Sequence, residues 1–407
     1  MTIRTGAFRA ALLTGAVCAL VLAQPALAQQ QRPGGVAPPD VNSTEGSLWA
    51  AAETAERRAR LSPQVNTDPA LNAYVNQVAC GIAPEYCGDL RIYVMDRPAF
   101  NASMAPNGYM EVWSGLLLRA ETEAELAFVL AHEISHFSAS HSLAQWNNIK
   151  GGLALALVVG AVAGGVSTYS GGGYSSDVSF LGDLAYLGAI AATFNYSRTQ
   201  EVEADRMGFD RMVAAGYEPG AAVALWRARQ DETRASTFPS VRRADAAGSI
   251  FRTHPITAER VAALQAMAEA HDAGGRSERE RYRAAVRPHL AAWLADDLRR
   301  RDFDGALVLT ARLERDGQDL GVLSFHRGQI YRTRREDGDL ELARDAYLTA
   351  SNYEDAPVAV WRELGDLQRR LGDVGGARLA YQTYLERATT AQDRWIVEDS
   401  LAGLGVM

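Results

Sequence analysis

The chain has 407 residues, enough for two ordinary domains that each bury a core. Hydrophobic residues make up 47% of it and charged residues 22%, a balance typical of a globular protein and not of a disordered chain or a membrane protein with many spans. The formal net charge is −8. This charge argues against nucleic acid as a partner, because its phosphates are negative as well.

The chain begins with a segment that fits a cleaved signal peptide (residues 1–28). Two arginines precede an uncharged apolar run over residues 10–23, and Ala-Leu-Ala at residues 26–28 matches the small-x-small pattern of a signal peptidase site. The alternative, a membrane anchor, is disfavoured because the run is short. We therefore expect an exported protein whose mature chain begins near Gln29.

The mature chain would keep two cysteines, Cys80 and Cys87, because Cys18 leaves with the signal peptide. Two cysteines so close together in an exported chain favour a disulfide over free thiols.

The first part of the mature chain is predicted to contain a leader, a helical stretch and a small hairpin. Residues 29–45 are rich in Pro, Gly and Gln and predict a flexible leader. A helical pattern follows over residues 46–77. Residues 91–94 and 109–113 resemble short strands with a turn-rich stretch between them, which predicts an antiparallel hairpin.

Two later helices have clear start signals. Thr122 and Glu125 fit a capping box ahead of a continuous Ala/Leu/Val pattern. Ser197 and Gln200 fit a second capping box, and Gly216 supplies the stop signal for that helix.

The segment between these helices, residues 151–195, begins with a glycine-rich stretch that has no charge over residues 151–176. Its apolar run is short and interrupted by glycine, which favours a flap or buried hairpin beside the site. Peripheral contact with a membrane, or insertion into it, is the alternative.

The last third of the chain is predicted to form a separate helical domain. A polar break over residues 268–280 divides residues 46–272 from residues 278–407. Within the second part, a pattern of small and aromatic residues recurs after 34 residues, the period of tetratricopeptide repeats. Ala343 and Tyr347 recur 34 residues later as Ala377 and Tyr381. Gly328 corresponds to Gly365, 37 residues later, because the first unit has a three-residue insertion around residues 335–339. An irregular helical domain is the alternative.

His132-Glu133-Ile134-Ser135-His136 lies inside the first capped helix. Histidines four residues apart share one helix face, so both imidazoles can bind one ion. Zinc lowers the pKa of a water ligand toward about 7, and a carboxylate beside that water accepts its proton. Glu133 is placed for that role. A chance match to such a short pattern is the alternative.

A zinc site needs a third protein ligand, and the second capped helix offers one. Glu201, Asp205 and Gly208 share one face of that helix at i, i+4 and i+7. We assign Glu201 to the metal and Asp205 to a hydrogen bond that orients a ligand histidine. Gly208 would let the two helices approach closely. Alternatively, the acidic residues form a solvated face that favours the helix N-terminus.

These motifs resemble metallopeptidase family 48 of the gluzincins, which includes the CAAX prenyl proteases, and its exported branch with C-terminal tetratricopeptide repeats in particular. The stretches that carry the resemblance are residues 101–117, 125–141, 197–212 and 253–260. The resemblance implies an α+β, mostly helical fold: a protease domain with a small antiparallel sheet, followed by an α-solenoid of repeats.

The resemblance also implies the roles of the site residues. It implies one Zn²⁺ on His132, His136 and Glu201, with Glu133 as the general base. It implies that His254 lies near the metal and can plug its open position. Arg260 matches a family arginine, to which we assign structural support; His141, off the ligand face, is predicted to be structural.

Peptidases with a helical zinc site hold the substrate extended against a sheet edge. The strand over residues 109–113, just before the metal helix, is the natural edge. We therefore assign substrate contacts to Asn101, Tyr109, Met110 and Glu111. The alternative is that this strand belongs to the core.

The prediction is a secreted, periplasmic zinc endopeptidase that acts in quality control of outer-membrane proteins. By resemblance, its repeats bind partners such as the barrel-assembly machinery. One alternative is a periplasmic chaperone or adaptor with a latent or structural zinc site. Another is a membrane-embedded protease that uses residues 151–195.

Overall fold

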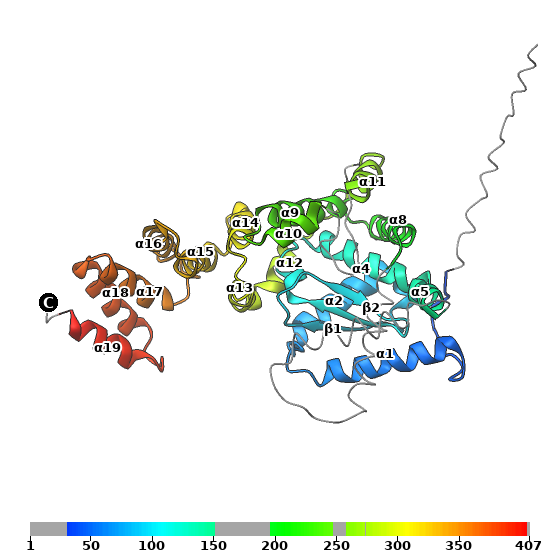
Figure 1. The fold of residues 1–407 in the computed structure, drawn as a ribbon, viewed down its shortest axis with the longest axis horizontal. Coiled ribbons are helices and arrows are strands. Elements are labelled where there is room, and N and C mark those ends of the chain that lie inside the picture. The colour runs from blue at the N-terminus through cyan, green and yellow to red at the C-terminus, as the bar shows by residue number, and fades with distance from the viewer. Residues whose placement is uncertain (1–30, 151–195, 247–257, 273, 405–407) are drawn as a thin grey trace, which may run out of the picture. The chain divides into compact units, whose positions relative to one another are not determined.

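The computed structural model describes residues 31–150, 196–246, 258–272 and 274–404. Within these ranges the protein is mostly helical with one small sheet (Figure 1), which agrees with the predicted α+β class. The predicted signal peptide, the insert over residues 151–195 and His254 lie outside the described residues. Of the helices in those ranges, none is long and apolar enough to cross a membrane.

The helices and strands follow one another along the chain in the order shown by the colours of Figure 1. The N-terminal elements are α1 (Thr44–Arg60), α2 (Pro69–Ile82), β1 (Arg91–Met95), β2 (Ala102–Met104), β3 (Tyr109–Trp113), α3 (Ser114–Leu117), α4 (Glu123–Ser138) and α5 (His141–Lys150). The middle elements are α8 (Arg198–Ala214), α9 (Ala221–Ala235), α10 (Pro239–Ala246) and α11 (Ala258–Glu269). The C-terminal elements are α12 (Arg279–Val286), α13 (Leu290–Leu298), α14 (Phe303–Leu313), α15 (Leu320–Arg334), α16 (Asp339–Ala350), α17 (Ala359–Arg370), α18 (Val374–Arg387) and α19 (Arg394–Gly403).

The sheet is mixed, and the predicted antiparallel pairing of residues 91–94 with 109–113 is wrong. Its strand order is β1-β3-β2, with β1 parallel and β2 antiparallel to β3. The turn-rich stretch between the two predicted strands contains β2, which reverses the chain once before β3 begins. The tight turn is therefore between β2 and β3, where Gly108 has φ +86° and Ala105 N–H donates to Tyr109 O at 2.7 Å.

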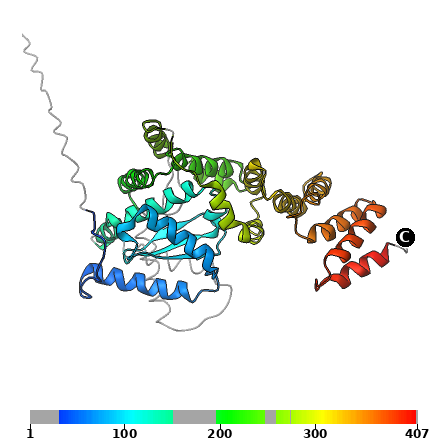
Figure 2. The same cartoon turned by 180° about the vertical axis from the view of Figure 1, so that it is seen from behind.

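Helices cover both faces of this sheet (Figures 1 and 2). One face carries Tyr93 and Tyr109, which pack against Ala52 and Ala59 of α1. The other face carries Val94 and other apolar side chains that join the main core with α2 and α4. The alternation of side chains along each strand produces these two packed faces.

The helix start signals are confirmed at both metal-site helices. Thr122 caps α4 by accepting the N–H of Glu125 at 3.1 Å. The Glu125 carboxylate accepts the N–H of Glu121, not that of Thr122, so the predicted capping box is formed only on one side. In α8 the box of Ser197 and Gln200 is complete.

The predicted helical stretch over residues 46–77 is two helices, α1 and α2, separated by residues 61–68. Pro63 and Pro69 interrupt the pattern here, because proline is tolerated at a helix start and not inside one. Asp68 then caps α2 by accepting the N–H of Ala70 at 2.8 Å. Cys80 and Cys87 form the predicted disulfide at the end of α2.

The described part of the predicted flexible leader is held against the domain. The N–H of Arg32 donates to Ser138 O at the end of α4, 2.8 Å away. The Asp89 carboxylate accepts the N–H groups of Gly35 and Val36, both at 2.9 Å. These bonds satisfy backbone groups that composition alone would leave to water. The flexibility of residues 29–45 stays a prediction.

The main core continues past the polar break at residues 268–280. Side chains of α12, α13 and α14, among them Tyr282, Trp293 and Leu309, belong to the same apolar cluster as α2 and α4. Arg119, which follows α3, also bonds across this region: it pairs with Glu232 of α9 at 2.6 Å and with Asp297 of α13 at 2.8 Å. The first helices after the break thus complete the core of the residues before it.

The C-terminal helices form two successive antiparallel pairs with the same crossing. In α15, a Cβ at Gly328 would lie 2.3 Å from the Tyr347 ring of α16. In α17, a Cβ at Gly365 would lie 2.6 Å from the Tyr381 ring of α18. Only glycine permits these crossings, and the matching tyrosines explain the period seen in the sequence.

Candidate metal centre

The candidate centre is built on α4, whose residues are all buried. Helix α8 packs directly against it, because a Cβ at Gly208 would lie 2.9 Å from the backbone nitrogen of His132. The predicted close approach at Gly208 is therefore present. It places Glu201, two turns earlier on α8, beside the histidines of α4.

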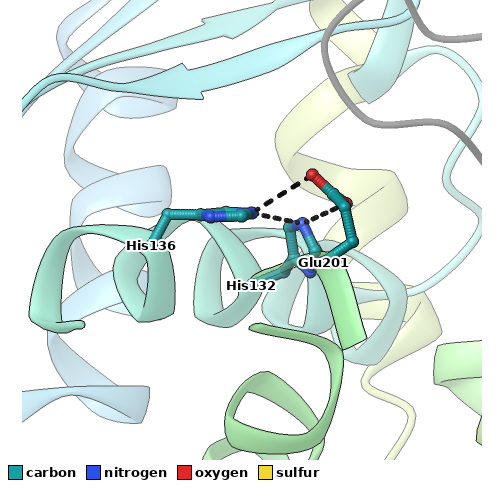
Figure 3. A group of neighbouring side chains, drawn as sticks. All are labelled: His132, His136 and Glu201. Carbon is teal, nitrogen blue, oxygen red and sulfur yellow. Dashed lines mark hydrogen bonds and ion pairs between the residues drawn. The ribbon is translucent and has the colours of Figure 1, made fainter. Parts of the chain in front are cut away.

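His132, His136 and Glu201 point toward one another (Figure 3), and each offers a ligand atom within 4.8 Å of the other two. The two imidazole Nε2 atoms are 3.1 Å apart. The Glu201 carboxylate lies 3.6 Å from His132 Nε2 and 3.7 Å from His136 Nε2. Ligand atoms about 2.0–2.1 Å from a tetrahedral zinc lie about 3.3 Å from one another, so this arrangement fits the ion.

Asp205 contacts the far nitrogen of the first histidine. Its carboxylate lies 3.0 Å from His132 Nδ1. An Nδ1–H that donates to this carboxylate leaves the Nε2 lone pair free for a metal. Asp205 thus lies close enough to His132 for the predicted contact, and its role in orienting a ligand stays a prediction.

Arg260 of α11 bridges the two acidic residues of α8. It lies 2.7 Å from the Glu201 carboxylate and 2.6 Å from that of Asp205, and it is 5% exposed. Burial alone would raise the pKa of Asp205, but Arg260 and His132 lower it to about 2. Asp205 is therefore ionised and ready to accept from His132 at any ordinary pH.

The second histidine has neighbours that sequence reasoning did not assign. His141 Nδ1 lies 2.9 Å from His136 Nδ1, and its Nε2 lies 3.4 Å from the carboxylate of Glu203. The Tyr196 ring stacks on His136 with 3.8 Å between ring centroids. These contacts fix the orientation of the His136 ring. His141 was predicted to be structural, and its contact with His136 Nδ1 helps to orient that ring.

Glu133 follows His132 on α4 and is 3% exposed. Burial raises the pKa of Tyr196, and the carboxylates of Glu133 and Glu201 raise it further. Both carboxylates are thus close enough to act on the same phenol. Glu133 lies near the ligand cluster without being one of its members.

Residues 65–268 match peptidase family M48. That range is half of the chain and contains every predicted ligand. The chain belongs to peptidase family M48. Family membership and the His132, His136 and Glu201 cluster together support a metallopeptidase.

Several named proteins are similar to this chain. The putative beta-barrel assembly-enhancing protease of Vibrio cholerae is 26% identical over 257 residues, which cover 61% of this chain and 51% of the relative. The beta-barrel assembly-enhancing protease of Escherichia coli is 25% identical over 233 residues, 55% of this chain and 45% of the relative. The mitochondrial metalloendopeptidase OMA1 of Schizosaccharomyces pombe is 30% identical over 187 residues, 45% of this chain and 49% of the relative. The chain spans about half the length of these relatives.

A cavity of about 260 Å³ lies beside the ligand cluster of this M48 domain. Tyr196, Glu201, Val202 and Arg260 are among its lining residues. An apolar hollow with a few polar groups next to Glu201 has the character of a ligand-binding pocket.

The predicted substrate contacts of β3 are not supported by the sheet. β3 is the central strand, so its backbone pairs on both sides, and the prediction that it forms an edge is wrong. Met110 is buried in the main core, whereas Tyr109 and Glu111 lie on the opposite face, where the Glu111 carboxylate accepts from Trp113 Nε1 at 2.7 Å. The alternative weighed above, a core strand, is the one observed.

The strand at the edge nearer α4 is β2. It packs against α4 and pairs with β3 on one side. Asn101 directly precedes β2 and accepts the N–H of Trp113 at 3.0 Å through its backbone oxygen. A substrate role for Asn101 stays a prediction, but the edge strand beside it is β2 and not β3. The sequence signal for β2 was weak because the strand has only three residues.

Proposed function

We propose that this protein is an exported zinc endopeptidase. The observation that carries the proposal is the buried convergence of His132, His136 and Glu201, with an acidic residue oriented on a ligand histidine and Glu133 beside them. Two imidazoles and one carboxylate that leave a coordination position open are the ligand set of hydrolytic zinc sites.

A zinc ion bound there would supply Lewis acidity toward water and toward the scissile carbonyl. Residues of the chain transfer the proton and position the groups involved. Glu133 accepts the proton of the attacking water and returns it to the leaving amine. Asp205 and Arg260 keep His132 and Glu201 in place, and the cavity beside Glu201 receives a substrate side chain.

The proposed site of action is the periplasm, and the proposed substrates are envelope or outer-membrane proteins. The signal-like segment at residues 1–28 and the names of the bacterial relatives support this part. The helix pairs α15/α16 and α17/α18, with their repeated glycine–tyrosine crossing, support tetratricopeptide-like repeats that bind partners. The barrel-assembly machinery is the partner that the relatives' names suggest.

Cleavage of casein by the purified mature protein tests the enzymatic proposal. The wild type is expected to cleave casein, to stop when zinc is chelated and to resume when zinc is restored. Glu133→Gln, which keeps the size of the side chain and removes its basicity, is expected to lose cleavage. Equal cleavage by both proteins would refute the assigned role of Glu133.

A resting state plugged by His254 is part of the proposal, carried over from the family resemblance. His254→Ala is then expected to cleave casein faster than the wild type, because a competing ligand has been removed. An unchanged or lower rate at equal zinc content would rule out the plug.

A second candidate function is a chaperone or adaptor. Its support is the set of large apolar side chains exposed on α18 and α19, which includes Leu379 at 65% and Trp395 at 67%. Suppression of the aggregation of an unfolded outer-membrane protein by Glu133→Gln would favour it. Cleavage of casein by the wild type, without suppression of aggregation by Glu133→Gln, would support the peptidase function and not the chaperone function.

A further inference from the structure

Five arginines and one threonine line a cavity of about 360 Å³ in the C-terminal helices, far along the chain from the metal ligands. They come from three segments: the loop between α13 and α14, the end of α15 and the end of α17. The lining residues are Arg301, Arg332, Thr333, Arg334, Arg335 and Arg370. No acidic side chain lines this arginine pocket, although the whole chain has a net charge of −8.

Two of the arginines are neutralised by neighbours outside the lining. Arg332 lies 2.8 Å from the Glu363 carboxylate. Arg334 lies 2.9 Å from Asp304 and 2.8 Å from Asp339. Their guanidinium groups are therefore fixed in place by ion pairs and retain N–H groups for another acceptor.

The charge of the other three arginines is not balanced by an acidic partner. Within the described part of the chain, Arg301, Arg335 and Arg370 form no ion pair with an acidic side chain, and all three are exposed. Three uncompensated cations around one hollow repel one another and attract an anion into it.

Helix ends alone do not account for this arrangement. An arginine in the last turn of a helix is favoured by the helix dipole, by about 0.3–1 kcal/mol, which applies to Arg334 and Arg370. Arg301 and Arg335, however, have φ values of 60° and 62°, a region that glycine or asparagine adopts at lower cost. The presence of arginine at both of these strained positions favours a role for its positive charge in binding an anion.

We propose that the arginine pocket binds a phosphate-bearing anion, either free or as the headgroup of a membrane lipid. The planar guanidinium fork matches two phosphate oxygens at once, and several forks around one hollow can hold a multiply charged group. The cavity has the size of an ordinary small-ligand site. This inference is independent of the proposed peptidase activity.

The test uses the full mature protein and two double variants. Arg335→Gln/Arg370→Gln removes two exposed arginines of the pocket that have no ion pair to lose. Arg369→Gln/Arg378→Gln removes two exposed arginines of α17 and α18 outside the pocket and is the matched control. Thermal unfolding is expected to be similar in all three proteins.

Binding of inorganic pyrophosphate is measured by calorimetry, and binding to vesicles is measured by sedimentation with phosphatidylglycerol against phosphatidylcholine. We expect the wild type and the control to bind at least one phosphate probe, more weakly as salt rises. The pocket variant is expected to bind at least about tenfold more weakly.

The two probes separate the sources of the anion. Binding to pyrophosphate without binding to anionic vesicles assigns a free anion, whereas selective binding to phosphatidylglycerol vesicles assigns a lipid headgroup. No binding to either probe, or equal affinity in the pocket variant and the control, would overturn the proposal.

Discussion

His132 has a contact on each side of its ring: Nε2 faces the ligand cluster and Nδ1 lies 3.0 Å from the Asp205 carboxylate. The carboxylate is kept ionised by Arg260, which holds its pKa near 2. Zinc affinity should therefore depend on a residue that never touches the metal.

Asp205→Asn tests this dependence. An amide at this position keeps the size and loses the charge, so His132 becomes a weaker and less oriented ligand. We expect zinc affinity to fall by about 10- to 100-fold, as for other residues that support a metal ligand, measured by competition with a chelating dye. Asp210→Asn, an exposed residue of the same helix, is the control and should leave affinity unchanged. Equal affinities in both variants would contradict the assigned role.

Asp297 should make stability depend on pH. Arg119 and Arg300 outweigh the effect of its burial and lower its pKa from 3.8 to about 2. A depressed carboxyl pKa stabilises the fold above the unfolded value of 3.8, and this contribution is lost as the pH falls toward 2. It amounts to about 2 kcal/mol.

Asp297→Asn should therefore lower the free energy of unfolding at pH 7 by at least about 2 kcal/mol. The gap between the variant and the wild type should narrow as the pH falls from 5 to about 2.5. Denaturant unfolding at each pH measures it. Asp296→Asn, whose carboxyl pairs with Arg299 at the surface, should show a small gap at every pH. A constant gap for Asp297→Asn would contradict the account.

The cluster of His132, His136 and Glu201 was predictable from the sequence because its spacing is a property of a helix. Histidines four residues apart share a face in any α-helix, and Glu201 and Asp205 share one in the same way. Tyr196 and His141 were not predictable as neighbours of His136. Their contacts depend on how the chain enters α8 and leaves α4, and no local spacing specifies that.

At the scale of helices and strands, the distance between α4 and α8 determines the site. Glu201 reaches the histidines only because Gly208 lets the helices touch, with no room for a Cβ beside the His132 backbone. The helix that carries Glu201 is thus positioned by a residue with no side chain.

Gly208→Ala is expected to push the helices apart. It should lower the free energy of unfolding by about 1–3 kcal/mol, as overpacking does in other cores, and it should also weaken zinc binding. Gly220→Ala is the control, because a Cβ there meets nothing within 4 Å. Calorimetric unfolding and zinc titration of both proteins measure the effects. A stable, fully zinc-binding Gly208→Ala protein would show that α8 is positioned by other contacts.

Local sequence patterns predicted two strands of the sheet but not how the strands pair. Two of its strands were visible as β-branched and aromatic runs, but β2 has three residues and lies among turn residues. Without β2, the direct hairpin was the simplest connection, and both the pairing and the edge were predicted wrongly. Strand order depends on long-range pairing, which a short strand hardly marks.

For the molecule as a whole, the polar break at residues 268–280 does not mark the end of the core. Tyr282, Trp293 and Leu309 pack in one cluster with α2 and α4. The buried Arg119 pairs with Glu232 before the break and with Asp297 beyond it. Composition predicted a polar break between two domains but could not show that the next helices fold back onto the residues before it.

Two shortened proteins test the extent of the core. A protein that stops after residue 272 loses α12 to α14 and should expose the apolar cluster, so we expect aggregation and strong binding of the dye ANS. A protein that stops after residue 337 keeps these helices and should remain soluble and bind zinc. A soluble, zinc-binding protein ending at residue 272 would show that the first part folds alone.

The most direct test of the central claim is the zinc content of Glu201→Gln beside that of Glu133→Gln. Both variants remove one buried carboxylate from the same site, but only Glu201 is assigned to the metal. We predict one zinc per chain in Glu133→Gln with casein cleavage lost, and zinc lost in Glu201→Gln. Zinc retained in Glu201→Gln at the wild-type affinity would contradict the account.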